Sequence, residues 1–121
     1  MTLKYSNYLN QHAIVTGGSS GIGKAVAKLL AQQGANLTLI ARDRPKLLQA
    51  QQEIATVRLN QTQQINIATA DVADRASITS VLDKAIANLG TPILLITSAG
   101  IAYPGYFSEI LYIVSKLSYQ L

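Results

Sequence analysis

A glycine-rich segment near the start of the chain has the residue types needed to hold a phosphate group. Residues 16–23 read Thr-Gly-Gly-Ser-Ser-Gly-Ile-Gly, after an apolar run at residues 12–15 and before a helical pattern at residues 25–31. A strand, a glycine turn and a helix in this order form a cradle for the diphosphate of a dinucleotide. An ordinary serine-capped turn is the alternative, but the flanking strand and helix favour a dinucleotide site.

The small residues of this glycine segment would each serve such a site. Gly17 would let the chain turn sharply after the strand, Gly21 would leave room for a phosphate, and Gly23 would permit close helix–strand contact. Ser19 and Ser20 would add hydroxyl donors. The helix start would add free N–H groups and a partial positive charge, which completes an anion site.

The spacing of the glycines separates related nucleotide sites. The glycines fall as T-G-x-x-x-G-x-G, whereas the commoner dinucleotide fingerprint is G-x-G-x-x-G. A phosphate loop of the nucleotide triphosphatases ends in Gly-Lys-Ser or Gly-Lys-Thr, but Ala25 follows Lys24 here. The segment therefore lacks the hydroxyl that would bind magnesium in a triphosphatase.

The composition excludes several other classes of function. The chain has 121 residues, of which 49% are hydrophobic and 13% charged, so at most one folded domain is expected. It has no cysteine and one histidine, His12, which we expect at a strand start, so neither thiol catalysis nor a metal site is predicted. The basic residues are scattered although the net charge is +4, which argues against a nucleic-acid partner. We expect no transmembrane segment, no signal peptide and a cytoplasmic protein.

Apolar patterns predict the elements that position the glycine segment. Strands are expected at residues 13–15, 36–41, 65–70 and 93–97, and helices at residues 24–33, from the cap Asp43 through Ile54, and from the cap Asp74 through Leu89. Val26, Leu29 and Leu30 should form the apolar stripe of the first helix, which Gly34 should end. Alternating strands and helices predict a Rossmann-like, doubly wound parallel α/β sheet.

The T-G-x-x-x-G-x-G segment resembles that of the short-chain dehydrogenase/reductase family. Two later places match the same family: Asp71 and Val72 after the third strand, and Ala99 and Gly100 after the fourth, where Thr97 stands in place of the family's asparagine. The resemblance implies that Asp71 and Val72 hold the adenine of the cofactor. It also implies that Ala99 and Gly100 allow its close approach.

The residues after the second strand bear on the choice of cofactor. An NAD-specific fold places a carboxylate there for the ribose 2′-hydroxyl, but this chain has Ala41 followed by Arg42. A guanidinium binds a 2′-phosphate through paired hydrogen bonds, and Lys46 would add a second cation, whereas Asp43 is assigned to capping. NADP(H) is therefore favoured, with a solvated helix start as the alternative. The predicted cofactor-binding residues are Gly17, Ser19, Ser20, Gly21, Ile22, Gly23, Arg42, Lys46, Asp71, Val72 and Ala99.

Within this family the chain looks like the 3-ketodihydrosphingosine reductases over about residues 12–110, through the phrases at residues 12–24, 41–50 and 100–107. That resemblance implies an NADPH-dependent reduction of the ketone of a long-chain sphingoid base, a lipid-like substrate that would favour peripheral membrane association. A catalytically inactive nucleotide-binding remnant or interaction module is the alternative.

The family's catalytic residues, a serine, a tyrosine and a lysine, are expected beyond the fourth strand. The tyrosine acts as general acid because the lysine lowers its pKa. Ser98, Tyr112 and Lys116 match the pattern, either as a compressed active site or by coincidence, and we favour coincidence and leave the catalytic residues unassigned. We expect residues 1–121 to form a single partial NADP(H)-binding domain, truncated after about the fourth strand, with strand order 3-2-1-4. Its fourth strand would then be an exposed edge, so we expect self-association or a homo-oligomer.

Overall fold

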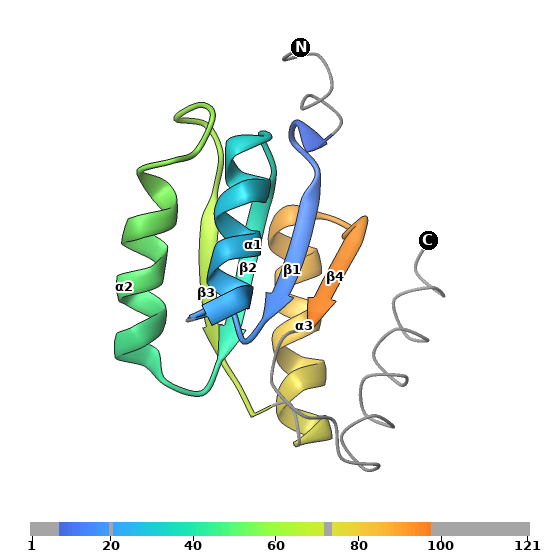
Figure 1. Ribbon diagram of the computed structural model, residues 1–121. Helices are drawn as coiled ribbons and strands as arrows, with labels where there is room; N and C mark the ends of the chain where they lie inside the picture. The colour runs from blue at the N-terminus through green and yellow to red at the C-terminus, as the bar shows by residue number, and fades with distance from the viewer. Residues whose placement is uncertain (1–7, 20, 72–73, 98–121) are drawn as a thin grey trace.

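The computed structural model describes residues 8–19, 21–71 and 74–97, which form a β-sheet with helices on both faces (Figure 1). The elements of this part of the chain are, in order, β1 (His12–Thr16), α1 (Gly21–Gln32), β2 (Asn36–Ala41), α2 (Arg44–Ala55), β3 (Ile65–Thr69), α3 (Arg75–Leu89) and β4 (Leu94–Thr97). None of these helices is long and apolar enough to cross a membrane.

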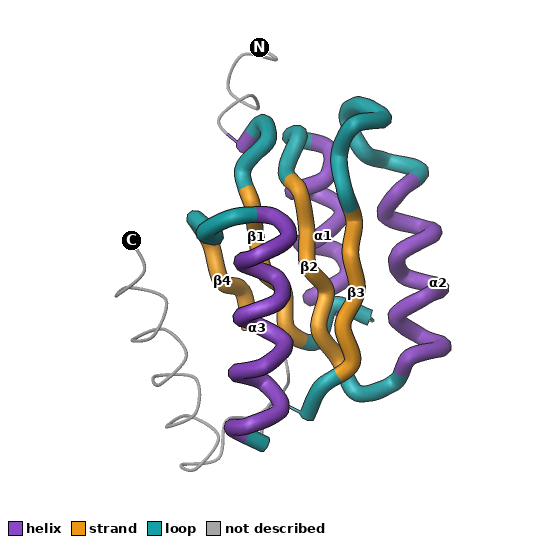
Figure 2. Tube along the Cα trace, turned by 180° about the vertical axis from the view of Figure 1, so that it is seen from behind, coloured by secondary structure: helices purple, strands orange, loops and turns teal. Residues whose placement is uncertain are grey.

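The strands form one parallel sheet in the order β3-β2-β1-β4, which confirms the predicted Rossmann-like topology. Helices α1 and α2 lie on one face of the sheet and α3 covers the other, as the front and rear views show (Figures 1 and 2). Because all the strands run the same way, their carboxyl ends share one edge, where ligands bind in open α/β sheets.

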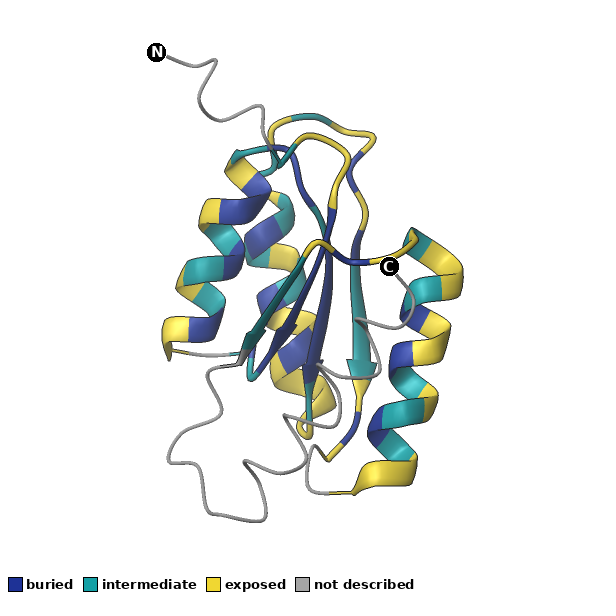
Figure 3. Ribbon diagram, turned by 90° about the vertical axis from the view of Figure 1, so that its right-hand side faces the viewer, coloured by how far each residue is buried: buried dark blue, intermediate teal, exposed yellow. Residues whose placement is uncertain are grey.

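Alternating side chains build a hydrophobic core on each face of the sheet (Figure 3). Ala13, Val15 and Leu39 pack with α1 and α2, whereas Ile14 and Ile40 pack with α3. These five residues are at most 1% exposed, and burying each large aliphatic side chain contributes about 1.5–3 kcal/mol. Their opposite orientations follow from the period of two residues in a strand.

The predicted helix caps are confirmed. The carboxylates of Asp43 and Asp74 accept hydrogen bonds from the N–H groups of Lys46 and Ser77, each at 3.2 Å. Gly34 ends α1 with φ of 95°, and the bonds Gly34 N–H to Ala31 O and Ala35 N–H to Leu30 O, both 3.1 Å, form a Schellman motif. An L side chain at Gly34 would be strained and would meet the backbone of Leu9 at 3.0 Å.

Several expected features differ in the structure, and among them β1 spans His12–Thr16 instead of residues 13–15 and β3 ends at Thr69 instead of residue 70. Helix α1 begins at Gly21 instead of residue 24, so the last two glycines of the segment lie in its first turn. Leu29 is 57% exposed, and the buried face of α1 combines the predicted Leu30 with the smaller residues Gly23, Ala27 and Ala31, which permit a close approach to the sheet. Strand β4 begins at Leu94, one residue later than expected.

His12 joins three elements at the opposite edge of the sheet. Its Nδ1–H donates to the carbonyl of Gly90 at 2.7 Å, and its Nε2 accepts from the Thr38 hydroxyl at 2.8 Å. The N–H of Ile93 donates to the His12 carbonyl at 2.9 Å, which ties the start of β4 to β1. Burial lowers the pKa of His12, and the bond to Gly90 offsets part of that effect.

Gln63 fixes the polar loop between α2 and β3 to the end of α1. Its buried side-chain amide donates to the carbonyls of Ala31 and Ala35 at 2.9 and 2.8 Å, and its Oε1 accepts from the N–H of Asn60 at 2.8 Å. These bonds satisfy a buried amide, which would otherwise carry a desolvation cost of about 1–3 kcal/mol.

Candidate cofactor-binding site

The glycine segment leaves β1 as a turn that is held against β2. Gly17 has φ of 73°, and its N–H donates to the carbonyl of Ile40 at 2.7 Å. The next residue, Gly18, is buried so closely that a Cβ there would lie 3.1 Å from Leu39 Cδ2 and 3.4 Å from the Val15 carbonyl oxygen. The turn is therefore fixed by contacts with β1 and β2 before α1 begins.

The start of α1 suits an anion better than the starts of the other two described helices. Gly21 has φ of 59°, and no heavy atom among the described residues lies within 4 Å of where its Cβ would be. The first turn of α1 contains no acidic residue, whereas α2 and α3 are capped by the carboxylates of Asp43 and Asp74. Open space beside positively polarised N–H groups fits a diphosphate.

Lys24 follows the glycine segment but is paired with α2. Its Nζ lies 3.0 Å from Glu53 Oε2, and Lys28 Nζ lies 3.3 Å from the same oxygen. Hydrogen bonds from Lys24 and then Lys28 lower the pKa of Glu53. These pairs link α1 to α2, and they engage the Lys24 ammonium with a carboxylate.

Two cations stand at the end of β2. Arg42 and Lys46 are exposed, and within the described residues neither side chain is in an ion pair. The carboxylate of Asp43, which lies between them in the sequence, accepts from the backbone N–H of Lys46. Asp43 is thus a helix cap, as predicted, and both cations are accessible to a ligand.

The parallel strands bring the predicted residues to one edge. The glycine segment follows β1, Arg42 follows β2, and Asp71 follows β3. Ala41 is paired with Thr69, and the Ala70 N–H donates to the Ala41 carbonyl at 3.0 Å, so the ends of β2 and β3 lie side by side. Ser19 is half-buried, and Ile22 and Asp71 are exposed at this edge.

The remaining predicted residues lie outside the part of the chain that the structure describes: Ser20, Val72, Ala99, Ser98, Tyr112 and Lys116. Conversely, the packing of Gly18 against Leu39 and the Lys24–Glu53 pair were not predicted from the sequence. The sequence around Gly18 does not indicate its contact with Leu39. That contact depends on where β2 lies, which no neighbouring residue reveals.

The chain matches a known protein family over most of its length. A family model described as short chain dehydrogenase matches residues 11–112. The chain belongs to this family. Its relatives include the 3-dehydrosphinganine reductase of Danio rerio and the 3-ketodihydrosphingosine reductase of Bos taurus, at 41% and 40% identity over 100 residues. The matches cover 82% of this chain but 30% of each relative, so the chain spans about a third of their length.

Solved structures share the fold. The C-domain of a bacterial malonyl-CoA reductase with NADP has a TM-score of 0.73 and 28% identity, covering 84% of this chain and 16% of that one. A glucose dehydrogenase of Caenorhabditis elegans in its apo-form has a TM-score of 0.77 and 27% identity, covering 92% and 49%. Membership in this oxidoreductase family and the NADP in one neighbour support a nicotinamide cofactor.

Proposed function

We propose that residues 1–121 form a partial Rossmann domain that binds NADP(H) at the carboxyl edge of the sheet. The observation that carries this proposal is the juxtaposition of an open, acid-free helix start at Gly21 with the two accessible cations Arg42 and Lys46. The glycine segment would receive the diphosphate on the N–H groups of α1. Arg42 and Lys46 would bind the 2′-phosphate.

The other predicted residues would complete the cofactor site. Gly21 would keep a side chain away from the diphosphate, whereas Gly17 would let the chain turn and Gly23 would allow α1 to approach the sheet closely. Ser19 and Ser20 would donate hydroxyl hydrogen bonds, and Ile22 would cover part of the cofactor. Asp71 and Val72 would hold the adenine, and Ala99 would let the cofactor approach β4. When bound, NADPH supplies a hydride to the carbonyl carbon of a substrate.

We further propose that the whole enzyme reduces the ketone of a 3-ketosphingoid base. The support is the activity for which the relatives at 40–41% identity are named, which this chain matches over 82% of its length. A long-chain substrate would bring such an enzyme to a membrane surface from the cytoplasmic side. This chain would contribute the cofactor-binding part.

The cofactor proposal is tested by titrating the intact chain with NADPH and NADH. Arg42→Ala should lower the affinity for NADPH about tenfold while leaving NADH nearly unchanged, because one charge-assisted bond to the 2′-phosphate is lost. Arg58→Ala, which removes a cation from the distant loop between α2 and β3, is the matched control. An unchanged NADPH/NADH affinity ratio in Arg42→Ala would refute the phosphate assignment.

A second candidate function is nucleotide binding without turnover, because the site residues that the structure describes would serve the cofactor alone. An assay with 3-ketosphinganine and NADPH separates the two. Turnover that is lost in Tyr112→Phe would establish the compressed site of Ser98, Tyr112 and Lys116. NADPH binding with no turnover would support the non-catalytic function for this chain.

A further inference from the structure

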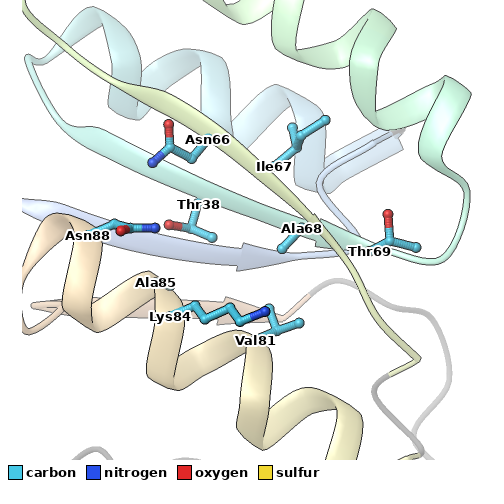
Figure 4. A pocket seen from close by; sticks show the side chains of 9 residues that line it. All are labelled: Thr38, Asn66, Ile67, Ala68, Thr69, Val81, Lys84, Ala85 and Asn88. Carbon is cyan, nitrogen blue, oxygen red and sulfur yellow. The ribbon is translucent and has the colours of Figure 1, made fainter.

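A hollow of about 280 Å³ lies on the α3 face of the sheet, away from α1 and α2 (Figure 4). It is bounded by β2 and β3 on one side and by α3 on the other. Thr38, Asn66 and Ala68 line it from the strands, and Lys84, Ala85 and Asn88 line it from the helix. Because α1 packs on the opposite face, this hollow is separate from the glycine segment.

The hollow exists because short side chains meet where α3 passes β2 and β3. The buried residues of α3, Ile78, Leu82 and Ala85, pack in one cluster with Ile14 of β1 and Ile40 of β2. Beside that cluster, the α3 face of β3 carries Asn66 and Ala68, which are too short to fill the space under the helix.

The polar side chains around the hollow are available to a ligand. Within the described residues, the side chains of Asn66, Lys84 and Asn88 make no hydrogen bond or ion pair. Thr38 is different, because its hydroxyl already bonds to His12 at 2.8 Å. Asn66 and Asn88 lie near Thr38 at one end of the hollow, as Figure 4 shows.

The charge and chemistry of the lining select one class of ligand. The nine described residues that line the hollow include one cation, Lys84, and no carboxylate. Asparagine amides and an ammonium donate hydrogen bonds to an anion, and the methyl groups of Ala68, Ala85 and Val81 offer an apolar wall. We propose that this hollow binds a small organic carboxylate with a short aliphatic chain, held at Lys84, Asn66 and Asn88.

Hexanoate is a suitable probe, and the backbone amide shifts of the intact chain are a suitable readout. Millimolar hexanoate should shift the amides of β3 and of α3 around Lys84, and hexanol should bind more weakly. Lys84→Gln should weaken hexanoate binding about tenfold through the loss of a charged donor. Ala68→Leu should abolish it by filling the hollow. Lys28→Gln, which removes a half-buried cation of α1 on the other face of the sheet, should leave hexanoate affinity unchanged, and thermal unfolding of each variant verifies folding.

Three results would overturn this proposal. Equal hexanoate affinity of Lys84→Gln and the unchanged chain would show that the cation is not used. Displacement of hexanoate by NADPH would place the carboxylate in the cofactor site. Shifts of the same amides that grow with protein concentration, without any hexanoate, would show that a second copy of the chain covers this face.

Discussion

His12 holds together three elements through one neutral imidazole. Its Nδ1–H must donate to Gly90, because a carbonyl oxygen can only accept, so its Nε2 is the acceptor for the Thr38 hydroxyl. His12 is 2% exposed and lies among the first residues of β1 and β2. A charged ring would therefore lose hydration, and burial is the main reason for its lowered pKa.

The lowered pKa of His12 predicts a loss of stability in mild acid. The unfolded chain binds the proton at about pH 6.5, whereas the folded chain resists it, so protonation favours unfolding. The free energy of unfolding should be constant above about pH 6.5 and should fall as the pH drops below that value. Chemical denaturation at a series of pH values measures this dependence.

His12→Gln provides the control for the pH series. An amide in place of the imidazole lacks the titration, so the variant should be less stable at neutral pH but should show a flatter profile from neutral to mildly acidic pH. The Glu53 carboxylate does not confuse the result, because its lowered pKa acts below its ordinary value of 4.5. A wild-type profile without a decline in this range would contradict the assignment.

At the scale of elements, the described helices differ in how they begin. Helices α2 and α3 each start at an aspartate whose carboxylate accepts a backbone N–H, and α2 also has Pro45 in its first turn. Helix α1 starts at a glycine and has no acid in its first turn. One N–H group at the start of each of α2 and α3 is thus bonded to an aspartate side chain, and the start of α1 is the place proposed for an external anion.

Asp43→Ala tests whether this aspartate acts as a cap. The substitution should lower the free energy of unfolding by about 1 kcal/mol, because the N–H of Lys46 loses its acceptor. The NADPH/NADH affinity ratio should stay the same, because the carboxylate is not assigned to the ribose. Urea denaturation and cofactor titration of this variant measure both quantities. A change in the NADPH/NADH affinity ratio would show that Asp43 contacts the cofactor and would contradict its assignment as a cap alone.

Local signals explain which features could be predicted from the sequence. The caps Asp43 and Asp74 and the Schellman glycine Gly34 act on neighbours within a few residues, so their roles are visible in the sequence itself. The exposure of Leu29 and the buried role of Gln63 depend on where other elements lie. Periodicity places residues on helix faces, but it does not say which face meets the sheet.

At the scale of the whole molecule, the sheet is covered by helices on both faces and has β3 and β4 as the outer strands of its described part. Strand β4 pairs with β1 alone in that part, and the adjoining Ile93 is 50% exposed. An apolar edge strand offers unpaired N–H and C=O groups to another chain. We therefore predict that isolated copies of the chain associate through β4.

Light scattering over a range of concentrations measures this association. Ile93→Lys should shift the chain toward monomer, because a charge beside the edge opposes strand pairing. Leu29→Lys introduces the same charge on the exposed side of α1 and should have little effect. A monomeric wild-type chain at all concentrations would refute self-association, and equal effects of both variants would refute the role of the β4 edge.

The binding of NADPH to the glycine segment is tested most directly by comparing Gly21→Ala with Gly90→Ala. Both glycines have positive φ, 59° and 87°, and among the described residues an added Cβ meets open space at each position, so Gly21→Ala should cost about 1–2 kcal/mol of stability. Gly90→Ala should cost about 1–3 kcal/mol, because its φ of 87° and ψ of 178° are open essentially to glycine alone. Only a Cβ at Gly21 would occupy the proposed diphosphate position. Calorimetric titration should therefore show NADPH affinity reduced at least about tenfold in Gly21→Ala and unchanged in Gly90→Ala. Equal NADPH affinity in the two variants would contradict the proposed site.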